Sequence, residues 1–283
     1  MGLVSLLIDA GARSDVGLVR KNNEDTYRVE PTLDLYVLCD GMGGEAHGEV
    51  ASTMAADAVV THCLEAQNNL SAPLFGEPRA DLSEASNRLA SAVTLANRKI
   101  FEAAANPLHR GMGTTIVAAW LKNGRLSLAH VGDSRAYLLR GGALEQLTAD
   151  HSLVAENVRR GIMTPQEAES SNLQSVLIRA LGSSADVQVD VSEHALLEGD
   201  MLVLCSDGLT RMVTDPEIAS TMTTVEPAQA AANRLIELAN EYGGVDNATV
   251  IVVRMLQGAN GLLARLKRWT TGADGGPTGK SSA

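Results

Sequence analysis

The sequence predicts a layered α+β domain in which long helices cover sheets of mainly antiparallel strands. Two observations support this prediction. Seven short apolar runs are separated by turn sequences, and three longer stretches are rich in helix-forming residues. Helices packed outside sheets are a stable way to bury such elements around one core. The chain has 283 residues, of which 45% are hydrophobic and 20% are charged, and this composition excludes a disordered chain.

The expected strands are rich in Val, Ile and Leu. Because most of them lack a clean alternation of apolar and polar residues, both faces of the sheets should be covered. Turns such as Lys122-Asn123-Gly124 and Arg140-Gly141-Gly142 favour antiparallel pairing of the runs that they join. The expected strands span residues 3–8, 35–39, 115–121, 126–131, 136–139, 201–205 and 248–253.

The expected helices span residues 49–65, 82–105 and 227–242, and Gly243-Gly244 ends the last of them. Residues 150–181 contain Gly161 and a Thr164-Pro165 pair, which indicate short helices in a loop-rich insertion. We therefore expect a single domain over residues 1–256, followed by a basic, flexible tail over residues 257–283. The amphipathic stretch 261–270 in this tail could dock on an acidic partner or a membrane surface, or pack on the domain.

Composition and charge exclude several classes of function. The net charge of −11 is the wrong sign for a non-specific nucleic-acid binder, and only 3% of the residues are aromatic. Three cysteines without a C-x-x-C pair make a disulfide framework or a zinc site improbable, so Cys39 and Cys205 are expected to be small buried hydrophobes. The apolar stretches are too short for a signal peptide or a transmembrane segment, which predicts a cytoplasmic protein.

Two segments with matching sequences bring an aspartate to the end of an apolar run. One delivers Asp40-Gly41 and the other delivers Asp207-Gly208. The glycine allows the backbone to bend tightly and leaves a carbonyl free to face a ligand. A single Asp-Gly pair is most often a plain turn, so the prediction depends on the whole set of carboxylates.

Further carboxylates follow the same plan. Asp133 lies at a strand-to-strand turn, Asp246 lies just before the last strand, and Asn23-Glu24-Asp25 adds two carboxylates ahead of a strand. Clustered carboxylates repel one another and are costly to bury unpaired. If these six side chains converge, Mg²⁺ or Mn²⁺ is their natural counter-charge.

These motifs, taken in order, resemble the metal-dependent type 2C protein phosphatases (the PPM family), and in particular the small bacterial members. The order of the motifs is more specific than any one of them. The match runs through nearly the whole chain, in segments 14–25, 40–44, 48–52, 111–115, 131–135, 147–152, 179–182, 205–209 and 246–250.

The resemblance implies a four-layer α-β-β-α sandwich with a metal centre between the loops of its two sheets. Carried over by position, Asp40 bridges two metal ions, Mn²⁺ or Mg²⁺, and Gly41 offers its carbonyl to one of them. Asp207 and Asp246 complete the first metal site. The implied reaction is in-line attack on phosphorus by a hydroxide that the metal ions generate, so Asp40, Asp207 and Asp246 are catalytic through this water.

The resemblance assigns roles to four more residues. Glu24 and Asp25 support the second metal ion, directly or through water, and Asp133 holds a third, weaker one together with Asp207. Arg20 matches the arginine that grips the substrate phosphate, because its planar fork can bond two phosphate oxygens. Considered without the resemblance, Arg20 would be a surface ion pair with Glu24, four residues further on.

The proton donor for the leaving group is not settled by the sequence. Many eukaryotic relatives have a histidine directly after the first Asp-Gly, where this chain has Met42. Bacterial members often carry one just after Gly-Met-Gly-Gly, where this chain has Glu45, and His47 follows two residues later. Either His47 or a metal-bound water is therefore the candidate. His130 is expected to be structural, and residues 150–181 match the family's flap subdomain.

The leading hypothesis is a phosphatase for phosphoserine and phosphothreonine in proteins, acting as a monomer and opposing a bacterial Ser/Thr kinase. Its partners are then phosphorylated proteins and not nucleic acid. One alternative is a non-catalytic, phosphatase-like docking module, and another is a regulator of anti-sigma-factor phosphorylation. A haloacid-dehalogenase-type phosphatase needs a second aspartate two residues after the first, where Met42 stands.

Overall fold

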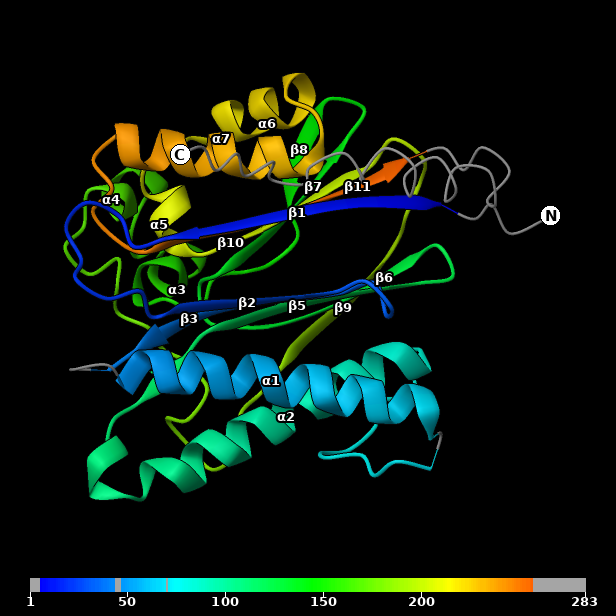
Figure 1. Ribbon diagram of the computed structural model, residues 1–283. Coiled ribbons are helices and arrows are strands. Elements are labelled where there is room, and N and C mark those ends of the chain that lie inside the picture. The colour runs from blue at the N-terminus through cyan, green and yellow to red at the C-terminus, as the bar shows by residue number, and fades with distance from the viewer. Residues whose placement is uncertain (1–5, 44–46, 70, 257–283) are drawn as a thin grey trace, which may run out of the picture.

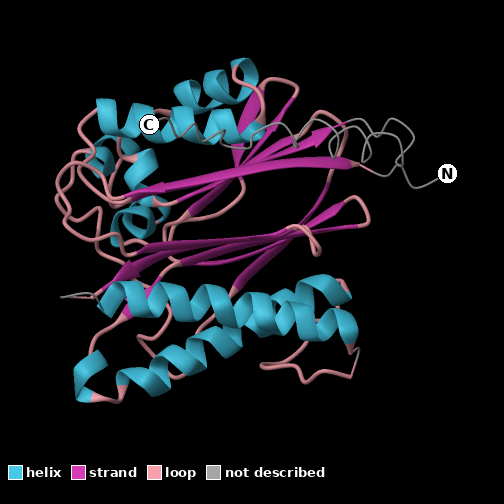
Figure 2. Ribbon diagram, in the orientation of Figure 1, coloured by secondary structure: helices cyan, strands magenta, loops and turns pink. Residues whose placement is uncertain are grey.

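Two antiparallel sheets lie face to face in the computed structural model, and helices cover the outer side of each sheet (Figures 1 and 2). The structure describes residues 6–43, 47–69 and 71–256. In the first sheet the strand order is β1-β11-β10-β7-β8. In the second sheet it is β2-β3-β5-β6-β9, and the short β4 also pairs with β3. The predicted four-layer α-β-β-α sandwich is therefore confirmed.

The strands are β1 (Leu7–Asp15), β2 (Asp25–Glu30), β3 (Leu35–Met42), β4 (Gly113–Thr114), β5 (Ile116–Lys122), β6 (Arg125–Val131), β7 (Arg135–Arg140), β8 (Ala143–Gln146), β9 (Asp190–Ala195), β10 (Met201–Cys205) and β11 (Ala248–Leu256). The helices are α1 (His47–Asn68), α2 (Glu84–Ala104), the 3₁₀ helix η1 (Pro107–His109), α3 (Leu153–Arg159), α4 (Pro165–Glu169), α5 (Asp207–Thr210), α6 (Asp215–Thr224) and α7 (Ala228–Glu241).

The central strands are buried on both faces, which explains their uninterrupted apolar sequences. In β3, Leu35 and Val37 face the core beneath α1 and α2, whereas Tyr36 and Leu38 face the other sheet. A third apolar cluster joins the first sheet to α6 and α7, with Val203 and Val252 among its members. Successive side chains of a central strand thus point to opposite faces of its sheet, one set toward the other sheet and one set toward the helices.

The three long helices form where the sequence predicts them. α2 begins after Ser83, whose Oγ accepts a hydrogen bond from the backbone nitrogen of Ser86 at 3.3 Å. α7 is followed by Gly243 and Gly244, which adopt positive φ values of 131° and 50°. Residues 150–181 contain the short helices α3 and α4, as expected for this insertion. The predicted tail, residues 257–283, lies outside the described residues.

Other boundaries predicted from the sequence are wrong. The strand expected at residues 3–8 overlaps β1 only at its end, because β1 continues to Asp15, and its backbone pairs with β11 along its whole length. Residues 3–5 lie outside the described residues. The expected runs also leave out β2, β8 and β9, which lie at the ends of the sheet orders and carry many polar residues. Helix α6 was missed although Thr214 and Glu217 form a capping box, a signal present in the sequence.

Candidate metal centre

Carboxylates from both sheets meet at one end of the sandwich. Asp25 begins β2 and lies directly opposite Asp40 of β3 in the strand register. Asp207 follows β10, and Asp246 lies two residues before the start of β11. The Oγ atom of Ser206 donates a hydrogen bond to Asp25 Oδ2 at 2.8 Å and so links the first sheet to the second. The structure therefore brings together the residues that the sequence singles out.

The pKa values of these carboxyls show how strongly the cluster resists carrying its full charge. Burial raises the pKa of Asp25 to about 7, although the hydroxyls of Thr249 and Ser206 oppose this rise. Burial also raises the pKa of Asp40 well above its usual range, and the charges of Asp25 and Asp207 add to the effect. Protons or cations must therefore neutralise part of the cluster near neutral pH.

Asp133 extends the cluster from the turn between β6 and β7. Its side chain is buried, and burial together with the charge of Asp207 raises its pKa to about 7. The next residue, Ser134, shares a hydrogen bond of 2.7 Å with the hydroxyl of Thr115, the residue between β4 and β5. The backbone nitrogen of Asp40 donates to the same hydroxyl at 3.1 Å, so one threonine connects the Asp133 turn to β3.

One oxygen of the cluster has no partner in the described part of the chain. Asp25 Oδ1 is buried and receives no hydrogen bond. A buried carboxylate oxygen without a donor is unfavourable unless a cation reaches it. Carboxylate and carbonyl oxygens are the ligands that Mg²⁺ and Mn²⁺ prefer. The residues present therefore fit divalent cations.

Glycines bring the backbone of three segments into close contact at this centre. The nitrogen of Gly41 donates to the carbonyl of Glu24 at 3.1 Å, and a Cβ atom on Gly41 would lie 2.2 Å from the carbonyl oxygen of Gly48. A Cβ atom on Gly48 would lie 2.7 Å from Glu24 Oε2. The Glu24 carboxylate thus lies against the first turn of α1, where burial raises its pKa and the positive charge of Arg20 opposes that rise.

Arg20 reaches the cluster from the loop between β1 and β2. Its Nη2 donates a hydrogen bond of 2.8 Å to Asp246 Oδ2, and this bond is the main reason that the pKa of Arg20 is raised. The side chain keeps 54% of its surface exposed. Arg20 therefore pairs with a residue far away in sequence and not with Glu24, the partner in the alternative interpretation. An incoming anion can still reach the guanidinium group.

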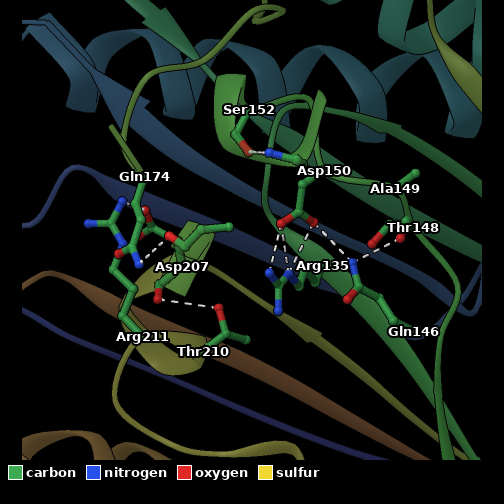
Figure 3. A network of polar contacts seen from close by, with 12 residues as sticks. Arg135, Gln146, Thr148, Ala149, Asp150, Ser152, Gln174, Asp207, Thr210 and Arg211 are labelled. Carbon is green, nitrogen blue, oxygen red and sulfur yellow. Dashed lines mark hydrogen bonds and ion pairs between the residues drawn. The ribbon is translucent and has the colours of Figure 1, made fainter. Parts of the chain in front are cut away.

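A second arginine, which the sequence analysis did not identify, also lies in the cluster. Arg211 pairs with Asp207 and lies 3.4 Å from Asp246 (Figure 3 shows the pair with Asp207). Its charge opposes the effect of burial, which raises the pKa of Asp207. The spacing of four residues between Asp207 and Arg211 was a signal that could have found this pair.

His47 lies at the first turn of α1, and its Cβ atom is 3.5 Å from the place that a Cβ atom on Gly43 would take, just after the end of β3. Its ring meets the ring of His109 edge-on, with 6.1 Å between the centroids. Glu45, which stands where bacterial members of the family often carry a histidine, lies outside the described residues.

A separate group of His130, His151 and Asp190 has donor atoms within 4.8 Å of one another. It is a hydrogen-bond network rather than a metal site. His151 Nδ1 accepts from the nitrogen of Gly132 at 3.0 Å, and His151 Nε2 lies 3.2 Å from Asp190 Oδ2. The guanidinium group of Arg179 bonds Asp190 at 2.6 Å, so a cation already neutralises this carboxylate. His130, expected to be structural, stacks on His151.

The chain is similar to known bacterial proteins. A family model described as "Protein phosphatase 2C" matches residues 19–241. The serine/threonine protein phosphatase PstP of Mycobacterium tuberculosis is 41% identical over 253 residues, which cover 89% of this chain and 46% of the relative. The protein phosphatase PhpP of Streptococcus pneumoniae is 34% identical over 245 residues, which cover 86% of this chain and 95% of the relative. The chain therefore spans about half the length of the mycobacterial relative.

The fold is also similar to that of solved structures. The catalytic domain of a PstP phosphatase, in a complex with two manganese ions, aligns with a TM-score of 0.73 and 37% sequence identity. The alignment covers 89% of this chain and all of that domain.

Proposed function

The chain belongs to the protein phosphatase 2C family, and we propose that it hydrolyses phosphoserine and phosphothreonine in proteins with the help of Mn²⁺ or Mg²⁺. The observation that carries this proposal is the convergence of five aspartates from both sheets beside Arg20, with one buried oxygen of Asp25 that no described residue hydrogen-bonds. The complex of the similar PstP domain with two manganese ions supports the identity of the metal.

We assign the metal ligands from the positions that the family motifs match. Asp40, the carbonyl of Gly41, Asp207 and Asp246 would hold two cations. Glu24 and Asp25 would support the second of these, and Asp133 with Asp207 would hold a third. When bound, such cations generate a hydroxide nucleophile near neutral pH and neutralise charge on the phosphoryl oxygens.

The chain's own residues would bind and orient the substrate. Arg20 would exchange its bond to Asp246 for bonds to two phosphate oxygens, because its guanidinium group is exposed on the outer side. The hydroxyl of Ser206 holds Asp25 in place. His47 is our candidate for the proton donor to the leaving alkoxide, at the first turn of α1.

A covalent cysteine mechanism is not supported by the structure. Cys39 and Cys205 are buried, and burial raises the pKa of the Cys205 thiol to about 12. A thiol of this kind is neutral at physiological pH and therefore a poor nucleophile.

The substrates that we propose are phosphorylated proteins. A partner Ser/Thr kinase, the monomeric state and the cytoplasmic location stay predictions from the sequence. None of the helices in the described part of the chain combines the length and the hydropathy that a membrane span requires.

The test is hydrolysis of p-nitrophenyl phosphate and of a phosphothreonine peptide, measured with Mn²⁺ and with EDTA. We expect turnover with Mn²⁺ only, and we expect Asp207→Asn to lower kcat by at least about 100-fold, since the change removes a ligand charge. Asp81→Asn is the matched control, because Asp81 is an exposed aspartate that pairs with Arg79. Metal binding without any turnover would instead support the non-catalytic docking module.

A further inference from the structure

Three apolar side chains are exposed beside the carboxylate cluster. Leu18, Val19 and Val245 expose 69%, 66% and 42% of their surface. Leu18 and Val19 directly precede Arg20, and Val245 directly precedes Asp246. We call these three residues the apolar rim.

The two loops that carry the apolar rim are held firmly against each other. The nitrogen of Leu18 donates to the carbonyl of Gly244 at 2.7 Å. Asn247 Nδ2 donates to the carbonyls of Val16 and Asn22, at 3.0 and 2.9 Å, and so ties both ends of the loop that contains Arg20. In Figure 1 this blue loop after β1 lies at the same end of the sandwich as the orange turn that leads into β11. The position of the apolar rim relative to Arg20 is therefore set by the backbone.

The close approach of the loops leaves no room for larger residues at their contact. Gly17 has a φ of 78°, and a Cβ atom on it would lie 2.4 Å from the carbonyl oxygen of Asp246. The Cγ atom of Leu18 lies 2.9 Å from the place that a Cβ atom on Gly244 would take. Leu18 thus lies next to Gly244, the residue that precedes Val245, so each of the two loops in contact carries part of the apolar rim.

Single apolar residues scattered over a surface are ordinary, but adjoining ones beside a site indicate a contact with a ligand. We propose that the apolar rim is a subsite for an apolar side chain next to the phosphorylated serine or threonine of the substrate. This inference rests on the proposed function. Arg20 complements the charge of the phosphate. Neighbouring residues of an extended peptide are only about 3.3 Å apart along its axis, so a flanking side chain can reach the residues that adjoin Arg20.

The experiment compares two phosphothreonine peptides, one with leucine and one with glycine on both sides of the phosphothreonine. The enzymes are the full chain, the Leu18→Ser/Val19→Ser double variant and Val245→Ser, all with Mn²⁺. Leu197→Ser is the matched control, because Leu197 is also an exposed apolar residue, with 54% of its surface accessible. Leu197 lies before the start of β10, whereas Asp207 of the carboxylate cluster lies after the end of that strand. p-Nitrophenyl phosphate, which has no flanking residues, is the reference substrate, and thermal unfolding checks that each variant folds.

We expect the full chain to prefer the leucine-flanked peptide by roughly 10-fold in kcat/KM, the size of effect that a buried apolar side chain has in other enzymes. In the double variant and in Val245→Ser, the ratio of kcat/KM for the leucine-flanked peptide to that for the glycine-flanked peptide should fall toward one. In Leu197→Ser this ratio should stay as it is in the full chain. These results would support the subsite.

Three results would overturn the inference and leave the proposed function standing. In the first, the full chain has the same kcat/KM for both peptides. In the second, the kcat/KM of the double variant falls by the same factor for both peptides and for p-nitrophenyl phosphate, which would mean that the apolar rim only supports Arg20. Sedimentation could show a dimer that the double variant dissociates while the peptide ratio stays the same, which would assign the surface to a second copy of the chain. If the full chain hydrolyses none of the substrates, the proposed function itself fails and the inference fails with it.

Discussion

Arg211 brings a positive charge into a cluster that we propose as a metal centre. It pairs with Asp207 and lies 3.4 Å from Asp246, and Arg20 approaches Asp246 from the other loop. In the protein without metal, these guanidinium groups supply part of the counter-charge that the carboxylates need. A divalent cation and Arg211 therefore compete for the same oxygen atoms.

We predict that Arg211→Ala binds Mn²⁺ more tightly and is less stable without metal. The dissociation constant measured by isothermal titration calorimetry should fall roughly 10-fold, because one competing charge is removed. The free energy of unfolding without metal should fall by about 1 kcal/mol, since the pair is partly exposed. Arg234→Ala, which removes an exposed pair with Glu241 on α7, is the control. Weaker Mn²⁺ binding by Arg211→Ala would contradict the competition.

At the scale of elements, the segment with α3 and α4 is held at both of its ends. At its start, Arg135 bonds both carboxylate oxygens of Asp150, as Figure 3 shows, with distances from 2.7 to 3.1 Å. At its end, Arg179 bonds Asp190 at the beginning of β9. His151 accepts a bond from Gly132 and also faces Asp190, so it connects both ends to the second sheet. This insertion is therefore anchored by buried and partly buried polar contacts, in addition to Leu181, which packs in the apolar core.

The pH dependence of this anchor follows from His151. Burial, with the charges of His130 and Arg179, lowers the pKa of His151 to about 4, whereas an unfolded histidine titrates near 6.5. Below pH 6.5 the unfolded chain takes up a proton that the folded chain does not. The stabilising contribution of neutral His151 is therefore complete above about pH 6.5 and is lost as the pH falls toward 4.

We predict that the stability difference between the native chain and His151→Asn shrinks by roughly 2 kcal/mol between pH 7 and pH 4. Asparagine keeps an acceptor for Gly132 but does not titrate. Urea unfolding at several pH values measures this difference. His194→Asn, at a histidine of β9 that bonds Ser192, is the control. A difference that stays constant across this range would show that His151 does not control the acid stability of the fold.

At the scale of the whole molecule, the two sheets are joined by an apolar layer and bring their charges together at one end. The layer contains Leu38 from the second sheet and Leu204 from the first. Asp25 and Asp40 come from the second sheet, while Asp207 and Asp246 come from the first. Apolar burial must therefore offset the repulsion between these carboxylates, and bound cations would relieve it.

We predict that Mn²⁺ stabilises the whole sandwich in one cooperative transition. Mn²⁺ at about 100 times its dissociation constant should raise the free energy of unfolding by about 2.7 kcal/mol, with an unchanged urea slope. Without metal, Asp40→Asn should be more stable than the native chain, because it replaces a buried carboxyl group, whose pKa burial raises, by a neutral amide. The free energy of unfolding of this variant should no longer respond to Mn²⁺. A variant that still responds fully to Mn²⁺ would remove Asp40 from the metal centre.

Much of the fold could be predicted because local patterns decide it. Buried strands such as β3 have continuous apolar sequences, and α2 and α7 have clear ends at Ser83 and Gly243. The edge strands β8 and β9 could not be predicted, because their polar sequences become strands only by pairing with a neighbour that is already in place. The same reason explains why β1 extends to Asp15 along β11.

The sequence by itself determined which chemistry this protein carries, because aspartates at the ends of apolar runs, in a fixed order, predicted both the carboxylate cluster and the family. Only the tertiary structure decided which groups compensate the negative charge of that cluster. The pairing of Arg20 with Asp246, the hydrogen bonds of Asn247 to the neighbouring loop, and the buried Asp25 oxygen that has no partner among the described residues each depend on contacts between distant parts of the chain. Local sequence sets the type of each side chain, but the packing of the two sheets sets which charges meet and which remain free to bind.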